Sequence, residues 1–558
     1  MRQNIRTAPP TWETAFFAIA LSILWVSPAS AAPAACEDLA KFPLTGGKIT
    51  SVVVVAEGTK IPLPPLPISL ISPAGFCRVA VTLTPTSDSA IMAEVWLPDP
   101  AKWNGNFLGS GNGGFGGSVS GPALDMRGAV AQGYATAGND LGHEITSLTI
   151  DGTWVLGHPE KVKDFAYRAD HVTAEFAKAL IAAYYGRAPQ FSYFRGCSNG
   201  GHEALMEAQK YPADYDGIVA GAPANAWTRI MTGFLWNEAA QLNMPQSEIP
   251  KAKLAMIQDA VMAKCDALDG VKDGIINDPR ACRFDPKVLL CTSGDAPNCL
   301  THPQFDALSK IYDGPVNPDT GERIHPGFPP GSEGLTGNWD TWIIGPKSSQ
   351  SQFANQFYGN FVMGDSKWNY RTFNFATDLA KADAAIGSII NSDSPDLGAF
   401  AARGGKLILF QGWADAAITP WGTIKYYQAV QKAMGADQAH RFVRLFMAPG
   451  MMHCGGGPGP NSFDAVASVA QWREKNQAPE TIVAARYANP MAVLTGAPAG
   501  EPVSRRPLCA YPSVAHWTGK GSSDQAENYT CRASEADAPA KSNAHAKAGV
   551  RAKAKEAA

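Results

Sequence analysis

The sequence lacks a charge excess of either sign, and its apolar N-terminal run is too short to cross a bilayer. Its 558 residues contain 47 Lys and Arg against 50 Asp and Glu, which gives a formal net charge of −3. Proteins that bind nucleic acid or anionic membranes normally carry a basic patch, so the composition gives no electrostatic case for either partner. The apolar run at residues 15–26 falls well short of the ~20 residues of a membrane-spanning helix. We therefore expect a small-molecule partner, no nucleic acid and no stable membrane insertion.

The two ends of the chain differ in composition from the rest. Arg2 and Arg6 precede the apolar run, and the small residues Ala29-Ser30-Ala31 follow it. This order of charge, apolar segment and small residues is typical of a secretory signal. We expect residues 1–31 to be a signal peptide and the protein to be secreted or periplasmic. Residues 533–558 are rich in Ala and Lys and contain no aromatic residue, which predicts a disordered tail.

The sequence also has no C-x-x-C pair, although it has ten cysteines. An even number of cysteines in an exported protein usually forms disulfides, whereas zinc sites commonly use C-x-x-C spacing. The clustered cysteines between residues 265 and 299 therefore favour disulfides over a zinc site.

Alternating structural elements occupy both ends of the mature chain and are interrupted in the middle. Residues 52–55, 77–83 and 90–97 are rich in β-branched and apolar residues and are separated by Pro, Gly and Ser, which indicates strands. Helical spacing follows at residues 166–185. The alternation of strands and helices predicts an α/β core.

Between about residues 222 and 403 the alternation is lost, and the sequence is dense in Trp, Pro, Gly and Cys. A structureless connection of that length is improbable inside a compact domain, so we expect a folded insertion. The predicted organisation is one catalytic domain made of residues 32–221 and 404–532, with a lid domain at residues 222–403.

Ser198 lies in the string G-C-S-N-G, between an apolar segment at residues 191–195 and a predicted helix at residues 201–211. Strand, tight turn with serine, then helix is the context of a nucleophile elbow. A turn serine is the alternative for an isolated G-x-S-x-G string, but the flanking elements favour a nucleophile.

A serine nucleophile needs a histidine to accept its proton and a carboxylate to orient that histidine. In α/β-hydrolases these residues follow the order Ser, Asp or Glu, His, on loops after sheet strands. Asp415 follows an apolar segment at residues 406–411, and His453 follows another at residues 442–448. Asp464 is an alternative acid. The histidine alternatives are His158, His171 and His202, but among these candidates only His453 follows a late strand and adjoins a cysteine.

Two further features belong to this predicted site. The oxyanion of a tetrahedral intermediate needs backbone N–H donors, for which we expect Asn199 together with Gly113 or Gly114 in the glycine-rich segment after residues 107–109. A mobile surface loop is the alternative for these glycines. Cys197 precedes Ser198 and Cys454 follows His453, so a disulfide between them would hold nucleophile and base together.

An acidic, turn-rich segment at residues 265–278 lies within the expected insertion. Its carboxylates and carbonyls are the hard oxygen ligands that calcium prefers, although the spacing is not that of an EF-hand. From these residues alone, a calcium loop and a solvated acidic turn are both open.

The combination of G-C-S-N-G-G, C-D-A-L-D-G-V-K-D-G, G-W-A-D and M-H-C-G-G-G, in that order, resembles the tannase and feruloyl esterase family, which also includes mono(2-hydroxyethyl) terephthalate hydrolase. The resemblance covers about residues 36–531. It implies an α/β-hydrolase core with a lid and catalysis by Ser198, Asp415 and His453. It also implies a structural Ca²⁺ bound by the side chains of Asp266, Asp269 and Asp273 and the backbone oxygens of Val271 and Ile275. The disulfides implied by the family are Cys36–Cys77, Cys197–Cys454, Cys265–Cys282, Cys291–Cys299 and Cys509–Cys531.

We therefore interpret the chain as a serine carboxylic-ester hydrolase whose substrate is a small aromatic ester. A serine peptidase and a non-catalytic, calcium-stabilised binding protein are the alternatives. The lid should supply an apolar pocket with polar anchors. The candidate substrate-binding residues are Trp227, Phe234, Trp339, Trp342, Phe361, Trp368, Tyr370 and Arg371. The sequence does not indicate the oligomeric state.

Overall fold

The computed structural model describes residues 34–145, 149–495, 497–534 and 536. The expected signal peptide and all but three residues of the expected C-terminal tail lie outside the described residues. No helix within the described ranges is long and apolar enough to span a membrane.

A nine-stranded mixed sheet forms the centre of the molecule, with the order β1-β4-β5-β7-β6-β8-β9-β10-β11. The strands from β7 to β11 in this order are parallel, whereas β1, β4, β5 and β7 pair antiparallel. The central strands are buried over most of their length, as expected for parallel strands covered by helices on both faces. The bounds are β1 (Gly47–Val55), β4 (Phe76–Leu83), β5 (Ile91–Pro98), β6 (Phe107–Ser110), β7 (Ala135–Asn139), β8 (Ser192–Cys197), β9 (Gly217–Gly221), β10 (Lys406–Gly412) and β11 (Val443–Ala448).

Helices cover both faces of this sheet. On one face, α1 (Ser120–Ala131) and α15 (Ala465–Lys475) pack on the central strands. On the other face lie α3 (Ala169–Tyr185), α4 (Asn199–Lys210) and α13 (Pro420–Met434). The architecture is that of an α/β-hydrolase, as the sequence predicted, and it places the ends of β8, β10 and β11 at one edge.

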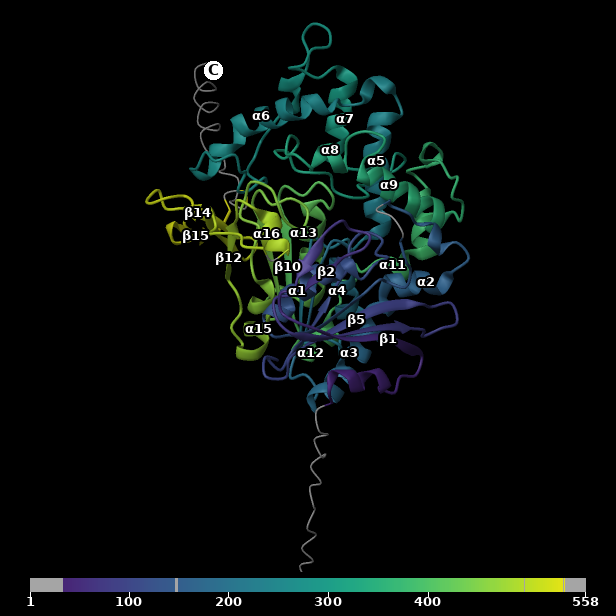
Figure 1. Ribbon diagram of the computed structural model, residues 1–558. Coiled ribbons are helices and arrows are strands. Elements are labelled where there is room, and N and C mark those ends of the chain that lie inside the picture. Colours follow the sequence, from purple (N-terminus) through teal and green to yellow (C-terminus); the bar gives the residue numbers. More distant parts are fainter. Residues whose placement is uncertain (1–33, 146–148, 496, 535, 537–558) are drawn as a thin grey trace, which may run out of the picture.

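The chain between β9 and β10 leaves the sheet and returns to it, although these two strands are direct neighbours. Most of this inserted segment, coloured teal to green, forms the upper part of the molecule in Figure 1, whereas its last helix, labelled α12, lies in the lower part of the view. Its own apolar core includes Ile257, Leu308 and Trp339. The helices of the segment are α5 (Trp227–Leu242), α6 (Leu254–Cys265), α7 (His302–Asp313), α8 (Trp339–Trp342), α9 (Ser349–Gln356), α10 (Asp378–Ala382), α11 (Ser388–Ile390) and α12 (Gly398–Ala402).

Three two-stranded sheets and three short α-helices lie outside the central sheet and the inserted segment. The hairpin of β2 (Lys60–Pro62) and β3 (Ser69–Ile71) lies near the N-terminal strands. At the C-terminal end, β12 (Thr481–Arg486) pairs with β13 (Ser504–Cys509), and β14 (Val514–Trp517) pairs with β15 (Tyr529–Arg532). The remaining α-helices of the described residues are α2 (Pro159–Lys163), α14 (Ala436–His440) and α16 (Pro490–Thr495).

Candidate active site

Ser198 occupies a sharp turn between β8 and α4. Its backbone has φ +66° and ψ −120°, a strained conformation for a residue with a side chain. The turn is possible because glycines flank it: a Cβ on Gly196 would lie 2.3 Å from the Gly200 carbonyl oxygen, and one on Gly200 would lie 2.8 Å from the Asn112 carbonyl oxygen. The Ser198 hydroxyl lines a cavity and has no hydrogen-bond partner within the part of the chain that the structure describes.

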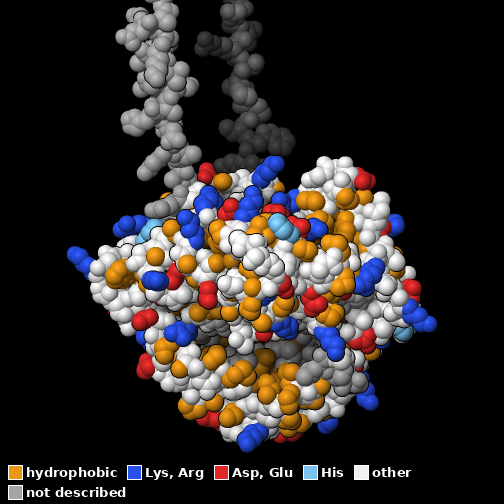
Figure 2. All heavy atoms as spheres, turned by 90° about the horizontal axis from the view of Figure 1, so that it is seen from above, with side chains coloured by type: hydrophobic (Ala, Val, Ile, Leu, Met, Phe, Trp, Pro, Cys, Tyr) orange, Lys and Arg blue, Asp and Glu red, His pale blue; other side chains and the backbone are white. Residues whose placement is uncertain are grey.

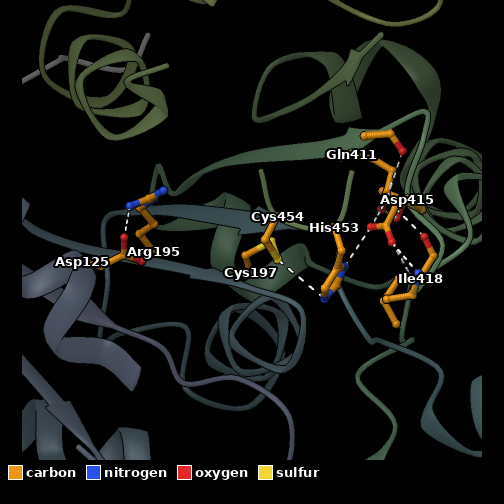
Figure 3. The surroundings of a disulfide bond; sticks show 11 residues. Asp125, Arg195, Cys197, Gln411, Asp415, Ile418, His453 and Cys454 are labelled. Carbon is orange, nitrogen blue, oxygen red and sulfur yellow. Dashed lines mark hydrogen bonds and ion pairs between the residues drawn. A yellow bond between two sulfur atoms is a disulfide. The ribbon is translucent and has the colours of Figure 1, made fainter. Parts of the chain in front are cut away.

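His453 and Asp415 form the hydrogen-bonded pair that the sequence predicted. His453 Nδ1 lies 2.9 Å from Asp415 Oδ2. Gln411 Nε2 also donates to Oδ2 at 2.8 Å, while the backbone amides of Ala417 and Ile418 donate to Oδ1 at 2.8 and 2.9 Å. The Asp415 side chain is fully buried, and these four hydrogen bonds fix its carboxyl group in a position that orients the imidazole. Figure 3 shows this arrangement.

A disulfide joins the residues next to the nucleophile and the base. Cys197 and Cys454 are bonded, and both line the same cavity as Ser198 and His453. The Cys454 Sγ lies 3.8 Å from His453 Nε2 (Figure 3). The other four disulfides match the pairs implied by the family resemblance: Cys36–Cys77, Cys265–Cys282, Cys291–Cys299 and Cys509–Cys531.

The alternative residues have other roles in the structure. Asp464 accepts a hydrogen bond from the Ala467 amide and so caps α15. His158 pairs with Asp88 at the surface, and His171 pairs with Asp214. His202 is buried and bonds to the Ile390 carbonyl, and burial lowers its pKa to about 4. None of these side chains lines the cavity of Ser198.

The candidate oxyanion donors also border this cavity. Gly113, Gly114 and Asn199 line it. The Gly113 amide already donates to Asn112 Oδ1 at 2.8 Å, whereas the amides of Gly114 and Asn199 have no acceptor among the residues described. Asn199 is the first residue of α4, where helix N–H groups and the helix dipole favour negative charge. Gly114 and Asn199 are therefore the better-placed pair of donors.

A single buried carboxyl group connects the two segments that carry these donors. Glu203, on α4, accepts from the Asn112 amide at 3.0 and 3.2 Å and from Asn199 Nδ2 at 2.8 Å. The neighbouring Asp170 carboxyl group, which accepts from Asn139 Nδ2 at 2.8 Å, interacts with Glu203. Burial raises the pKa of both groups. Nothing in the local sequence pattern distinguished Glu203 from the other polar residues of α4.

The cavity has a volume of about 450 Å³ and two walls of different character. One wall comes from the insertion and from the loop after β10, and the other comes from the glycine-rich loop, α1 and β8. Trp342 also packs edge-on against the His453 ring, with ring centroids 5.1 Å apart. The apolar side chains of the first wall are Trp227, Met231, Phe234, Trp342, Phe353, Ala417 and Ile418.

Three of the candidate substrate-binding residues line this cavity: Trp227, Phe234 and Trp342. The other five do not. Trp339 is fully buried in the core of the insertion, whereas Phe361, Trp368 and Tyr370 pack against the main apolar cluster. Phe361 contacts the rings of Phe115, Trp154 and Phe165, which lie outside the insertion. Arg371 lies over the Tyr370 ring and donates to the Leu242 carbonyl at 3.0 Å.

Met231 and Phe353 were missed by the sequence analysis. The spacing of Trp227, Met231 and Phe234 on α5 places them along one helix face, so helical periodicity could have identified Met231. Phe353 stacks in parallel with Trp342 across 6.3 Å, which is a tertiary contact without a local signal.

The expected calcium ligands lie together in the loop after α6. Asp266 Oδ1 accepts from the Asp273 and Gly274 amides, Asp269 Oδ1 accepts from the Val271 amide, and Asp273 pairs with Arg506. No group of three or more His, Cys, Asp or Glu side chains converges as a metal site in the described ranges. The carboxylate and carbonyl oxygens of the loop are the ligand type that calcium prefers, and burial and then the Asp273 charge raise the pKa of Asp269.

Comparisons with known proteins agree with this architecture. The sequence profile described as "Tannase and feruloyl esterase" matches residues 77–532. An uncharacterized esterase of Xanthomonas campestris is 41% identical, with 90% of this chain and 92% of the relative covered. A probable feruloyl esterase of Arthroderma benhamiae is 33% identical (89% and 93% covered), and the mono(2-hydroxyethyl) terephthalate hydrolase of Piscinibacter sakaiensis is 32% identical (78% and 80% covered). The crystal structure of feruloyl esterase B from Aspergillus oryzae matches with a TM-score of 0.79 at 28% identity, covering 89% of this chain and 99% of that one.

Proposed function

Because the chain belongs to the tannase and feruloyl esterase family, whose members are carboxylic ester hydrolases, we propose that it is an exported serine esterase that cleaves esters of aromatic acids. The single observation that carries this proposal is the convergence of Ser198, His453 and an apolar aromatic wall on one cavity.

The proposed reaction is acyl transfer in two steps. Ser198 attacks the ester carbonyl while His453 accepts its proton, and Asp415 stabilises the imidazolium that forms. The Gly114 and Asn199 amides bind the developing oxyanion. His453 then protonates the leaving alcohol. In the second step water attacks the acyl-enzyme while His453 accepts its proton, and His453 returns the proton to Ser198 as the acid leaves.

Aryl specificity is supported by the cavity and by the relatives. A volume of about 450 Å³ lies within the usual range for small-molecule sites. The rings of Trp227, Phe234 and Trp342 on its wall suit a planar acyl group, because aromatic pairs gain energy beyond the area that they bury. The relatives described as feruloyl esterases and as mono(2-hydroxyethyl) terephthalate hydrolase act on esters of aromatic acids according to their names.

Export is supported by the five disulfides, since such bonds persist in oxidising compartments. On the face shown in Figure 2, Lys/Arg and Asp/Glu side chains are interspersed. A mixed surface of this kind agrees with a small molecule as the partner rather than a polyanion. We also propose a structural Ca²⁺ in the loop of Asp266, Asp269 and Asp273, with the backbone oxygens of Val271 and Ile275 as further ligands.

Two measurements test the proposed function. The first is hydrolysis of methyl gallate, methyl ferulate, chlorogenate and mono(2-hydroxyethyl) terephthalate, with a feruloyl amide to detect peptidase activity. The second is labelling by a fluorophosphonate probe, with a Ser198→Ala variant as the control. We expect ester cleavage and labelling that depends on Ser198. Comparable amide turnover would favour a peptidase, and a folded protein that does not label would favour a binding protein.

A further inference from the structure

The second wall of the cavity carries an ion pair that the proposed chemistry does not use. Arg195 lies on β8, three residues before Ser198, and Asp125 lies on α1. Successive side chains of a strand alternate between the two faces of a sheet, so Arg195 shares the face of Tyr193, which packs with α1. Arg195 Nη1 donates to Asp125 Oδ1. Figure 3 shows this pair on the opposite side of the Cys197–Cys454 disulfide from His453.

The pair remains accessible from the cavity. The side chain of Arg195 is 36% exposed and that of Asp125 is 30% exposed. Both residues line the cavity together with Ser198. Apart from their mutual contact, neither side chain is hydrogen-bonded to another residue in the described ranges. An ion pair of this exposure contributes little to stability, so its unused donors and acceptor are available to a ligand.

The two walls differ in the groups that they offer. The wall from the insertion presents aromatic and aliphatic side chains, whereas the wall from α1 and β8 presents Asp125 and Arg195 beside Leu124. A substrate whose ester carbonyl sits at Ser198 extends in both directions from that atom. If its aryl group occupies the aromatic wall, its alcohol portion meets Arg195 and Asp125.

We propose that Arg195 and Asp125 form a binding subsite that recognises the alcohol portion of the ester through hydrogen bonds to its hydroxyl groups, and that these two side chains set the preference among alcohols. The proposal rests on the proposed aromatic-ester hydrolysis and assigns the residues that contact the other half of its substrate.

The chemistry of the pair favours neutral hydroxyl groups over an anion. A hydroxyl both donates and accepts, so adjacent hydroxyls can donate to the Asp125 carboxylate and accept from the Arg195 guanidinium. A carboxylate on the alcohol would be attracted by Arg195 but repelled by Asp125, and the pair as a whole carries no net charge. A methyl ester has no group that reaches either residue by hydrogen bonding.

The test compares esters that share an acyl group and differ in the alcohol. We would measure kcat/KM for glyceryl ferulate, arabinosyl ferulate, feruloyl quinate and methyl ferulate, and express specificity as the ratio of each polyol ester to the methyl ester. Wild type should prefer the two neutral polyol esters. Arg195→Gln and Asp125→Asn should each lower these ratios about tenfold, the effect expected for a lost hydrogen bond to a charged group. Asp125→Asn should raise the quinate ratio, because it removes the repulsion.

Arg187→Gln is the matched control. Its guanidinium stacks over Trp103 at the surface, 4.3 Å from the ring centroid, and we expect it to leave the ratios unchanged. Arg195→Lys keeps the positive charge but loses the planar guanidinium group, so it should give an intermediate ratio. This variant replaces Arg195→Gln in the test if Arg195→Gln does not fold.

The proposal would be overturned if wild type prefers methyl or quinate esters, or if substitution at Arg195 and Asp125 leaves the ratios unmoved. A protein that cleaves no ferulate ester would contradict the proposed function instead. In that case the pair glyceryl monoacetate and methyl acetate still measures the alcohol preference, so the two failures can be distinguished.

Discussion

At the scale of single residues, Glu203 shows how one buried group can organise a catalytic centre without touching the substrate. Its carboxyl group bonds to the Asn112 amide in the glycine-rich loop and to the Asn199 side chain after the nucleophile. These two segments supply the candidate oxyanion donors, Gly114 and Asn199. We therefore expect Glu203 to act as a positioning residue that sets the distance between the two amides.

Substitution of Glu203 should affect turnover more than substrate binding. Glu203→Ala removes both hydrogen bonds and should lower kcat at least tenfold, since loss of one oxyanion donor costs about 10²–10³ in kcat. Glu203→Gln retains an acceptor for Asn112 and a donor for Asp170, so it should keep most of the activity. The measurement is kcat and KM for p-nitrophenyl acetate, with thermal unfolding as the check on folding. Similar kcat values for the two variants would contradict the assigned role.

The raised pKa values of Asp170 and Glu203 should also appear in the pH dependence of stability. Burial is the largest cause of the raised pKa of each carboxyl group in the folded state. Above the ordinary carboxyl pKa of about 4, the folded protein therefore binds more protons than the unfolded chain. The stabilising contribution of these two groups is largest at low pH and is lost as the pH rises through their raised pKa values. Urea titrations across this range should show a shallower decline for Glu203→Gln than for wild type. Parallel pH profiles for the two proteins would contradict this contribution of Glu203.

At the scale of elements, the sequence predicted the parts of the site that depend on local patterns. The segment from β8 through Ser198 to α4 was predicted because an apolar strand, a glycine-flanked serine and a helix follow one another directly. Asp415 and His453 were predicted because each follows an apolar strand.

Residues brought together by tertiary packing had no such signal. Asp125 and Arg195 are 70 residues apart in the chain. They meet only because α1 packs on the face of the sheet toward which Arg195 points. The aromatic residues of the insertion could not be divided between its core and the cavity, since both environments select the same side chains. Trp339 and Trp342 belong to the same short helix, yet only Trp342 lines the cavity.

The disulfide between Cys197 and Cys454 joins β8 to the loop after β11, across a sequence separation of 257 residues. We expect its reduction to lower turnover before the protein unfolds, because a displacement of about 1 Å between reacting groups can cost about 10²-fold in rate. The double variant Cys197→Ala, Cys454→Ala should therefore lose at least tenfold in kcat while retaining its far-UV circular dichroism. The double variant Cys291→Ala, Cys299→Ala removes a bridge that spans only 8 residues of the insertion and is the control. Equal activity of the first variant and wild type would contradict this role.

At the scale of the whole molecule, the acidic loop links the insertion to the C-terminal hairpins. Asp273 pairs with Arg506 on β13, Asn277 Nδ2 donates to the Ala515 carbonyl on β14 at 2.8 Å, and Ser534 donates to Asp278. The Cys265–Cys282 disulfide closes the base of this loop. An ion bound here would stabilise the junction between two parts of the chain that are far apart in sequence.

Calcium removal should therefore lower thermal stability. A ligand at 100 times its Kd stabilises the folded state by about 2.7 kcal/mol, so we expect EGTA to lower Tm by a few degrees and added Ca²⁺ to restore it, while Mg²⁺ restores it poorly because it requires a tighter octahedral site. Titration calorimetry should detect one Ca²⁺ per chain, and Asp269→Asn or Asp273→Asn should weaken binding at least tenfold. Asp319→Asn, which changes an exposed turn carboxylate in the insertion, should bind Ca²⁺ as wild type does. If EGTA leaves Tm unchanged and no heat of binding is measured, the loop is an acidic turn, and its negative charge is balanced by Arg506 and the backbone amides alone.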